Sequence, residues 1–191
     1  MAESEMEWLQ KAVQGSEEAF EVLVEMYQKP VYNLCYRMLG NAQDAEDAAQ
    51  ESFWRAYQAL HRYDQQRPFL TWLLSIAAHY CIDQHRKRKL PSIELDLLPE
   101  ETIPVDAPIP ELSVLQSEQE IKVQKMLSVL SNQDRAAIIL RYWYDFSEEE
   151  ISRALSLSVS AVKSRMHRSR KRIAEMWASQ ETIPYSMEKV V

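Results

Sequence analysis

Glycine is almost missing from this chain, since Gly15 and Gly40 are the only two glycines in 191 residues. Tight β-turns need residues with positive φ, and glycine adopts that conformation at the lowest cost. A protein built from many short strands would therefore need more glycine than this sequence has. Hydrophobic residues make up 46% of the chain, which is enough to bury a core. We therefore expect an all-α fold.

A proline-rich acidic segment divides the chain. Residues 90–115 contain five of the eight prolines, and residues 90–120 contain eight acidic residues and no lysine or arginine. Proline at this density interrupts helices and strand ladders and favours an extended chain. We interpret residues 1–89 and 116–178 as two small helical domains, residues 90–115 as an extended acidic linker between them, and residues 179–191 as a tail.

Apolar periodicity indicates four helices in the first domain. The first helix should end near Gly15, and Ser16 should cap the second. Pro30 should kink or restart this second helix, which then runs on to Gly40. The third and fourth helices are expected over residues 42–60 and 68–89.

The second domain ends in a helix-turn-helix pattern. Helices are expected over residues 118–130, 132–144, 147–155 and 159–177. Ser131 or Asn132 can cap the second of these helices, and Ser147 with Glu150 forms a capping box at the start of the third. Only three residues separate the last two helices, and the final helix is basic, which is typical of DNA-binding helix-turn-helix units.

The final helix carries a dense block of positive charge. The stretch "VKSRMHRSRKR", residues 162–172, has six Lys or Arg in eleven positions, although the whole chain has a formal net charge of −7. The bland interpretation is a solvated charge run. However, no acidic residue occurs between Glu150 and Glu175, so we expect no i,i+4 ion pairs to neutralise the block. Nucleic-acid binding is therefore the favoured interpretation.

A helical wheel separates this helix into a core stripe and an outward face. The core stripe consists of Val162, Met166, Ser169 and Ile173. The outward face consists of Ser160, Ser164, His167, Arg168 and Lys171, with Lys163 and Arg170 on one flank and Arg165 and Arg172 on the other. Small and forked side chains suit base edges in the major groove, and flanking cations suit phosphates.

Aromatic and cationic residues are interleaved near the end of the first domain. Aromatic rings among cations can stack on unpaired bases. For Phe53, Tyr57 and Trp72 we favour a core role, because a small helical domain needs large apolar groups. For the loop "RYDQQRPF", residues 62–69, a nucleic-acid role and a core role both remain open.

Nothing in the sequence favours an enzyme or a bound cofactor. Asp47 and Glu51 share a helix face, but no Glu-x-x-His motif accompanies them as in a metal site. His79, Cys81 and His85 do not converge on one zinc ion at spacings of two and four. No phosphate-binding loop, dinucleotide-binding turn or nucleophile elbow occurs. We expect no catalytic residue, no metal and no cofactor.

The sequence also indicates the compartment. The acidic N-terminus has no apolar core of a signal peptide, and no apolar run is long enough to cross a membrane. Cys35 and Cys81 lie among apolar residues and are expected to be buried thiols in a reducing compartment. We expect a cytoplasmic protein without membrane insertion.

Three stretches in this order resemble the extracytoplasmic-function (ECF) group of the sigma-70 family of bacterial RNA polymerase subunits. They are "YRMLGNAQDAEDAAQESFWRAYQAL", "FLTWLLSIAAHYCIDQHRKRK" and "FSEEEISRALSLSVSAVKSRMHRSRKRI". The resemblance implies a sigma2 domain and a sigma4 domain joined by a linker. The chain departs from the family pattern at Ser75 and His79, and it has Ser156 and Ser160 where glycine is common.

The resemblance also implies roles for individual residues. Binding to the beta-prime clamp helices of core polymerase falls to Asp47, Gln50, Glu51 and Phe53. Recognition and melting of the promoter −10 element falls to Arg62, Tyr63, Arg67, Phe69, Thr71, Trp72, His79, Asp83 and Arg86. Recognition of the −35 element falls to Ser160, Lys163, Ser164, Arg165, His167, Arg168 and Lys171. Further implied partners are the beta flap of the polymerase and an anti-sigma factor.

Two functions compete at this point. The first is a sigma factor that directs core polymerase to specific promoters. The alternative is a free-standing transcriptional regulator that binds duplex DNA through the same helix-turn-helix. A regulator has no need for an acidic polymerase-docking helix followed by a basic, aromatic melting segment, so the sigma factor is favoured.

Overall fold

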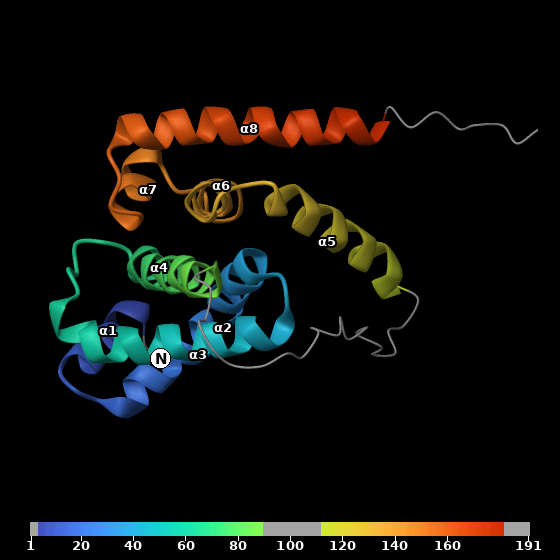
Figure 1. Ribbon diagram of the computed structural model, residues 1–191. Helices are drawn as coiled ribbons and strands as arrows, with labels where there is room; N and C mark the ends of the chain where they lie inside the picture. The colour runs from blue at the N-terminus through green and yellow to red at the C-terminus, as the bar shows by residue number, and fades with distance from the viewer. Residues whose placement is uncertain (1–3, 90–111, 182–191) are drawn as a thin grey trace, which may run out of the picture.

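The computed structural model describes residues 4–89 and 112–181 (Figure 1). Every regular element in these two ranges is a helix, which confirms the all-α expectation. The elements are α1 (Glu5–Val13), α2 (Glu17–Leu39), α3 (Ala42–Ala59), the 3-10 helix η1 (Leu60–Arg62), α4 (Phe69–Lys89), α5 (Leu112–Ser128), α6 (Asn132–Tyr144), α7 (Glu148–Ala154) and α8 (Val159–Glu181).

The N-terminal bundle is built around α2, which packs against α1, α3 and α4. Ser16 caps α2 by accepting a hydrogen bond from the Ala19 amide, as the sequence predicted. At the other end Gly40 has a φ of +87°, a conformation that glycine adopts without strain, and its amide donates to the Tyr36 carbonyl. Both ends of the longest helix of this bundle are therefore set by local chemistry.

Pro30 does not restart α2, contrary to one part of the prediction. The helix is a single element of 23 residues that contains this proline. A proline inside a helix removes one backbone hydrogen bond and costs about 3 kcal/mol. Apolar side chains are buried on both sides of it, for example Leu23 before it and Leu34 after it. Burial of these apolar side chains offsets the free-energy cost of the proline, so the helix continues past Pro30.

In the C-terminal bundle, α6 and α7 pack beneath α8, and α5 also contacts α8. Ser131 caps α6 by accepting from the Asp134 amide, and Ser147 forms the predicted capping box with Glu150 at the start of α7. Between α6 and α7 the chain turns at Asp145, which has a φ of +52°.

Two helices extend beyond their predicted ends. α5 begins at Leu112 rather than at residue 118, and α8 ends at Glu181 rather than at residue 177. The last proline of the acidic segment is Pro110, and no proline or glycine follows it before α5 begins. Nothing in the local sequence therefore stops either extension. The rest of the predicted linker and tail, residues 90–111 and 182–191, lies outside the described residues.

The two bundles are in contact. α4 packs against α6 and α7, and α2 packs against α5 and α6. In Figure 1, α6 and α7 lie between the N-terminal bundle and α8, so α8 runs along the side of the molecule that is remote from α1–α4. This arrangement leaves the outer face of α8 open.

Both cysteines are buried, as predicted: Cys35 and Cys81 are free thiols in the core. Contact with Cys35 and burial raise the pKa of the Cys81 thiol. Among residues 4–89 and 112–181 no helix is both long enough and apolar enough to cross a membrane.

Candidate nucleic-acid and protein interfaces

The predicted core stripe of α8 faces the protein interior. Val162, Met166 and Ser169 are buried, and Ile173 is partly buried. Of the residues predicted to read the −35 element, the exposed ones are Ser160, Lys163, Ser164, His167, Arg168 and Lys171. The open face of α8 therefore combines small polar groups with cations, which suits a groove of duplex DNA.

A tight turn connects α7 to α8. Ser156 stands in this turn with a φ of +54°, although it is not glycine. The Leu157 amide donates to the Ser152 carbonyl over 2.9 Å, and the Ser152 hydroxyl donates back to the Leu157 carbonyl over 2.5 Å. The Ser158 hydroxyl then accepts from the Ala161 amide at the start of α8. These contacts fix the angle between the two helices without glycine.

The cations of α8 are less isolated than the sequence suggested. Lys171 pairs with Glu175 one turn later (3.8 Å), although the expectation was that no i,i+4 pair would form. Lys163 pairs with Glu148 of α7 (3.5 Å). The first pair was overlooked because the sequence analysis treated Glu175 only as the end of the stretch without acidic residues. The second pair could not be expected from the sequence, because the tertiary fold brings Glu148 of α7 next to α8. Both pairs are exposed, so they contribute at most about 1 kcal/mol each and can open for DNA.

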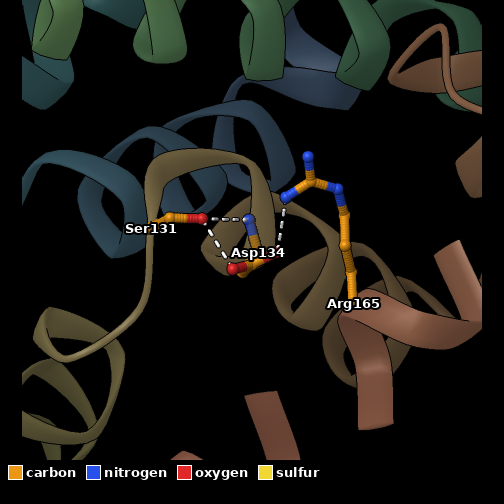
Figure 2. Close-up of polar contacts among 3 residues, drawn as sticks. All are labelled: Ser131, Asp134 and Arg165. Carbon is orange, nitrogen blue, oxygen red and sulfur yellow. Dashed lines mark hydrogen bonds and ion pairs between the residues drawn. The ribbon is translucent and has the colours of Figure 1, made fainter. Parts of the chain in front are cut away.

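Arg165 is the one predicted −35 residue that is not exposed on the open face of α8. Its Nη1 atom lies 2.8 Å from Oδ1 of Asp134 in α6 (Figure 2), and its side chain is only 24% exposed. By contrast, Arg168, Arg170 and Arg172 are exposed, and none of them has an ion pair in the part of the chain that the structure describes.

The loop before α4 is held by aromatic rings. The centroids of Tyr63, Phe69 and Trp72 lie 5.0 to 5.7 Å apart. Tyr63 and Phe69 are buried, and the Tyr63 hydroxyl donates to the Arg67 carbonyl. Burial also raises the pKa of this hydroxyl. The Tyr63 and Phe69 rings therefore have a core role, while Arg62 and Arg67 are the exposed cations of this loop.

The remaining predicted −10 residues lie along α4. Thr71 is partly buried, and His79 is exposed with its Nδ1 atom 2.9 Å from the Ser75 carbonyl oxygen. Asp83 pairs with Arg86 over 3.3 Å. His85 faces elsewhere, with its Nε2 atom 2.8 Å from the Met38 carbonyl oxygen, so the three residues weighed as zinc ligands have separate surroundings.

A groove of about 830 Å³ runs between α2 and α3. Its walls include six apolar or aromatic side chains: Phe20, Val24, Tyr32, Phe53, Trp54 and Tyr57. Gln50 also lines it, whereas Asp47 and Glu51 lie outside the lining, and Glu51 pairs with Arg55 over 2.8 Å. Two of the four residues predicted to bind polymerase therefore meet in this groove.

Sequence reasoning counted Trp54 only among the aromatic residues interleaved with cations and did not assign it to a protein interface. Its side chain is 56% exposed at the groove, beside Tyr57. A large exposed aromatic group in a concave apolar surface is typical of a protein-binding site. A signal was present in the sequence, because Trp54 lies one position outside the apolar stripe of its helix, next to the buried Phe53.

Taken together, the fold and these surfaces define a two-domain helical protein with a DNA-binding helix-turn-helix and a separate apolar groove. The family comparison identifies the class. The sigma-70 region 2 profile matches residues 23–90, and the sigma-70 region 4 profile matches residues 120–173.

Similar proteins agree with these profiles. ECF RNA polymerase sigma factor SigW of Bacillus subtilis is 38% identical over 170 residues, which cover 85% of this chain and 90% of that protein. RNA polymerase sigma-H factor of Pseudomonas aeruginosa is 30% identical over 178 residues, covering 90% of this chain and 92% of that protein. The chain therefore belongs to the sigma-70 family and is an ECF RNA polymerase sigma factor.

A solved structure shares the fold. CnrH in complex with the cytosolic domain of CnrY has a TM-score of 0.67 at 23% identity, covering 90% of this chain and 96% of that chain. A sigma factor acts in transcription initiation and is not an enzyme, so catalysis of RNA synthesis belongs to the polymerase. The free-standing regulator is thereby set aside. From here, α1–α4 are called sigma2 and α5–α8 are called sigma4.

Proposed function

We propose that this sigma factor recruits core polymerase through the groove between α2 and α3 and directs it to promoters through α4 and α8. The observation that carries the proposal is the separation of surfaces: an apolar groove with exposed Trp54 on sigma2, and a cationic open face on α8. The occupant of the groove would be the beta-prime clamp helices, and sigma4 would also contact the beta flap.

The acidic residues beside the groove suit a cationic partner. Asp47 is exposed on α3, and Glu17, Glu21 and Glu46 line the groove. A helix that lays apolar side chains into the groove and basic side chains along its rim would be complementary to this surface.

Promoter reading would be divided between the two domains. On sigma4, Ser164, His167 and Arg168 would approach base edges of the −35 element while Lys163 and Lys171 contact phosphates. On sigma2, Arg62, Arg67 and His79 would contact the −10 strand at its phosphates and bases. The core positions of Tyr63 and Phe69 support a role in shaping this loop rather than in stacking on bases.

An anti-sigma factor and a cytoplasmic location complete the proposal. CnrH is bound by the cytosolic domain of CnrY, and the sigma factor RpoE of Bartonella quintana, with a TM-score of 0.61 at 21% identity, is in complex with the anti-sigma factor NepR. A protein of the same kind would hold this chain away from polymerase until a signal releases it.

Transcription in vitro with purified core polymerase and genomic templates tests the proposal. We expect initiation at a restricted set of promoters that the core alone does not use. Trp54→Ala should weaken core binding by about 2 kcal/mol, as for a central interface residue. Met26→Ala, which removes an exposed methionine of α2 that does not line the groove, is the matched control. Absence of promoter-selective initiation would refute the proposed function.

A further inference from the structure

The positive charge of Arg165 is paired with a carboxylate of sigma4 itself. The ion pair with Asp134 joins α8 to α6, and the two side chains are only 24% and 14% exposed. The other ion pairs of α8 are different, since Lys163–Glu148 and Lys171–Glu175 join side chains that are each more than a third exposed. Because a partly buried pair is screened less by solvent and salt, Asp134–Arg165 is the stronger link.

Asp134 is itself held in place (Figure 2). The Ser131 hydroxyl donates to Oδ2 of Asp134 over 2.7 Å, and Ser131 Oγ accepts from the Asp134 amide over 3.3 Å. Asp134 stands in the first turn of α6, where the helix dipole favours a negative charge. One carboxylate oxygen is thus bound by Ser131 and the other by Arg165.

We propose that Arg165 is a positioning residue that does not read the −35 element itself. Ser131, Asp134 and Arg165 form a clasp that fixes α8 against the start of α6. The clasp sets the angle at which Ser164, His167 and Arg168 meet the duplex, so it acts on specificity through them. Nη1 of Arg165 is bound to Asp134 and the side chain is only 24% exposed, so the guanidinium is held toward α6 and not on the open face of α8, where a two-pronged contact with guanine would be made. This inference rests on the proposed role of α8 in reading the −35 element.

Substituting Asp134 tests the clasp, because Asp134 does not need to touch DNA. In holoenzyme transcription, Asp134→Asn should lower the preference for the parent promoter over single-base −35 variants by roughly fivefold or more. Glu175→Gln is the matched control, because it also removes one negative charge. It breaks the Lys171–Glu175 ion pair, which lies within α8 and does not join two helices. Its preference should stay at the parent value.

Further variants of the same residues complete the test. Asp134→Asn combined with Arg165→Ala should be no worse than either single change, and Arg165→Lys should retain most of the preference. A loss with Arg165→Ala but not with Asp134→Asn would overturn the proposal and make Arg165 a direct reader. An equal loss on all promoters, with the preference unchanged, would also overturn it and leave only a stability role. If the parent protein shows no promoter-selective initiation, the proposed function fails instead.

Discussion

Three arginines of α8 show how the fold gives one residue type different tasks. Arg165 is bound to Asp134, whereas Arg168 is exposed on the outward face and Arg170 is exposed on its flank. Position around the helix decides which guanidinium meets a protein carboxylate and which meets solvent. Charge density along the sequence therefore locates a DNA-binding helix, but it does not say which of its cations touches DNA.

Replacing Arg168 separates base contacts from phosphate contacts. If Arg168 reads a base, Arg168→Ala should cost about 1–3 kcal/mol in −35-dependent initiation, concentrated at one promoter position. Arg170→Ala, on the flank, should weaken all promoters alike and reduce the salt dependence of binding. Transcription from a panel of single-base promoter variants measures both. An unchanged promoter preference for Arg168→Ala would count against its role.

At the scale of elements, side-chain caps define where the helices begin. Serine caps α1, α2, α6 and α7, and asparagine caps α3. Each cap satisfies an amide that has no partner within its helix. These residues were visible in the sequence, which is why the starts of α2, α6 and α7 were predicted well. The start of α5 and the end of α8 were predicted less well, because neither boundary has a proline or glycine next to it.

The cap of α7 offers a test at this scale. Ser147 accepts from the Glu150 amide over 3.1 Å, and Glu150 accepts from the Ser147 amide over 2.7 Å. Ser147→Ala should cost about 1 kcal/mol of stability and lower the Tm by about 2–4 °C. Ser128→Ala is the control, because Ser128 bonds only the Lys125 carbonyl at the end of α5. Equal melting of the two variants would show that the capping box contributes nothing.

At the scale of the whole molecule, the distribution of charge matters more than its sum. The formal net charge is −7, yet the open face of α8 is cationic. Net negative charge opposes non-specific attraction to DNA, while a local cationic face still allows binding once the protein is delivered by polymerase. We therefore expect this acidic sigma factor to need its partner for stable promoter binding.

Salt titration checks this dependence. The free protein should bind duplex DNA weakly, and with about four phosphate contacts its affinity should fall roughly a hundredfold between 50 and 200 mM salt. Holoenzyme on its promoter should be tighter and should discriminate strongly against other sequences. Tight, sequence-specific duplex binding by the free protein would contradict the prediction and favour independent DNA recognition.

The sequence alone determined the helical class, the position of most helices and the open face of α8. These follow from local physical chemistry: scarce glycine, apolar periodicity, capping serines and a run of cations. It also carried the resemblance to ECF sigma factors, which the family profiles and relatives confirm.

Only the tertiary structure decided which side chains meet across helices. It paired Arg165 with Asp134, placed Tyr63 and Phe69 in the core, and brought Trp54 to the edge of a groove. It also showed that α2 continues past Pro30 as one helix. Arg135 and Tyr144 of sigma4 donate hydrogen bonds to the Met38 and Pro30 carbonyls of this helix. The contact of Arg165 with Asp134 and those of sigma4 with α2 join residues far apart in the chain, and the packing of whole helices selects them. A local pattern, such as the position of Trp54 just outside the apolar stripe of its helix, does not identify the partner of a side chain.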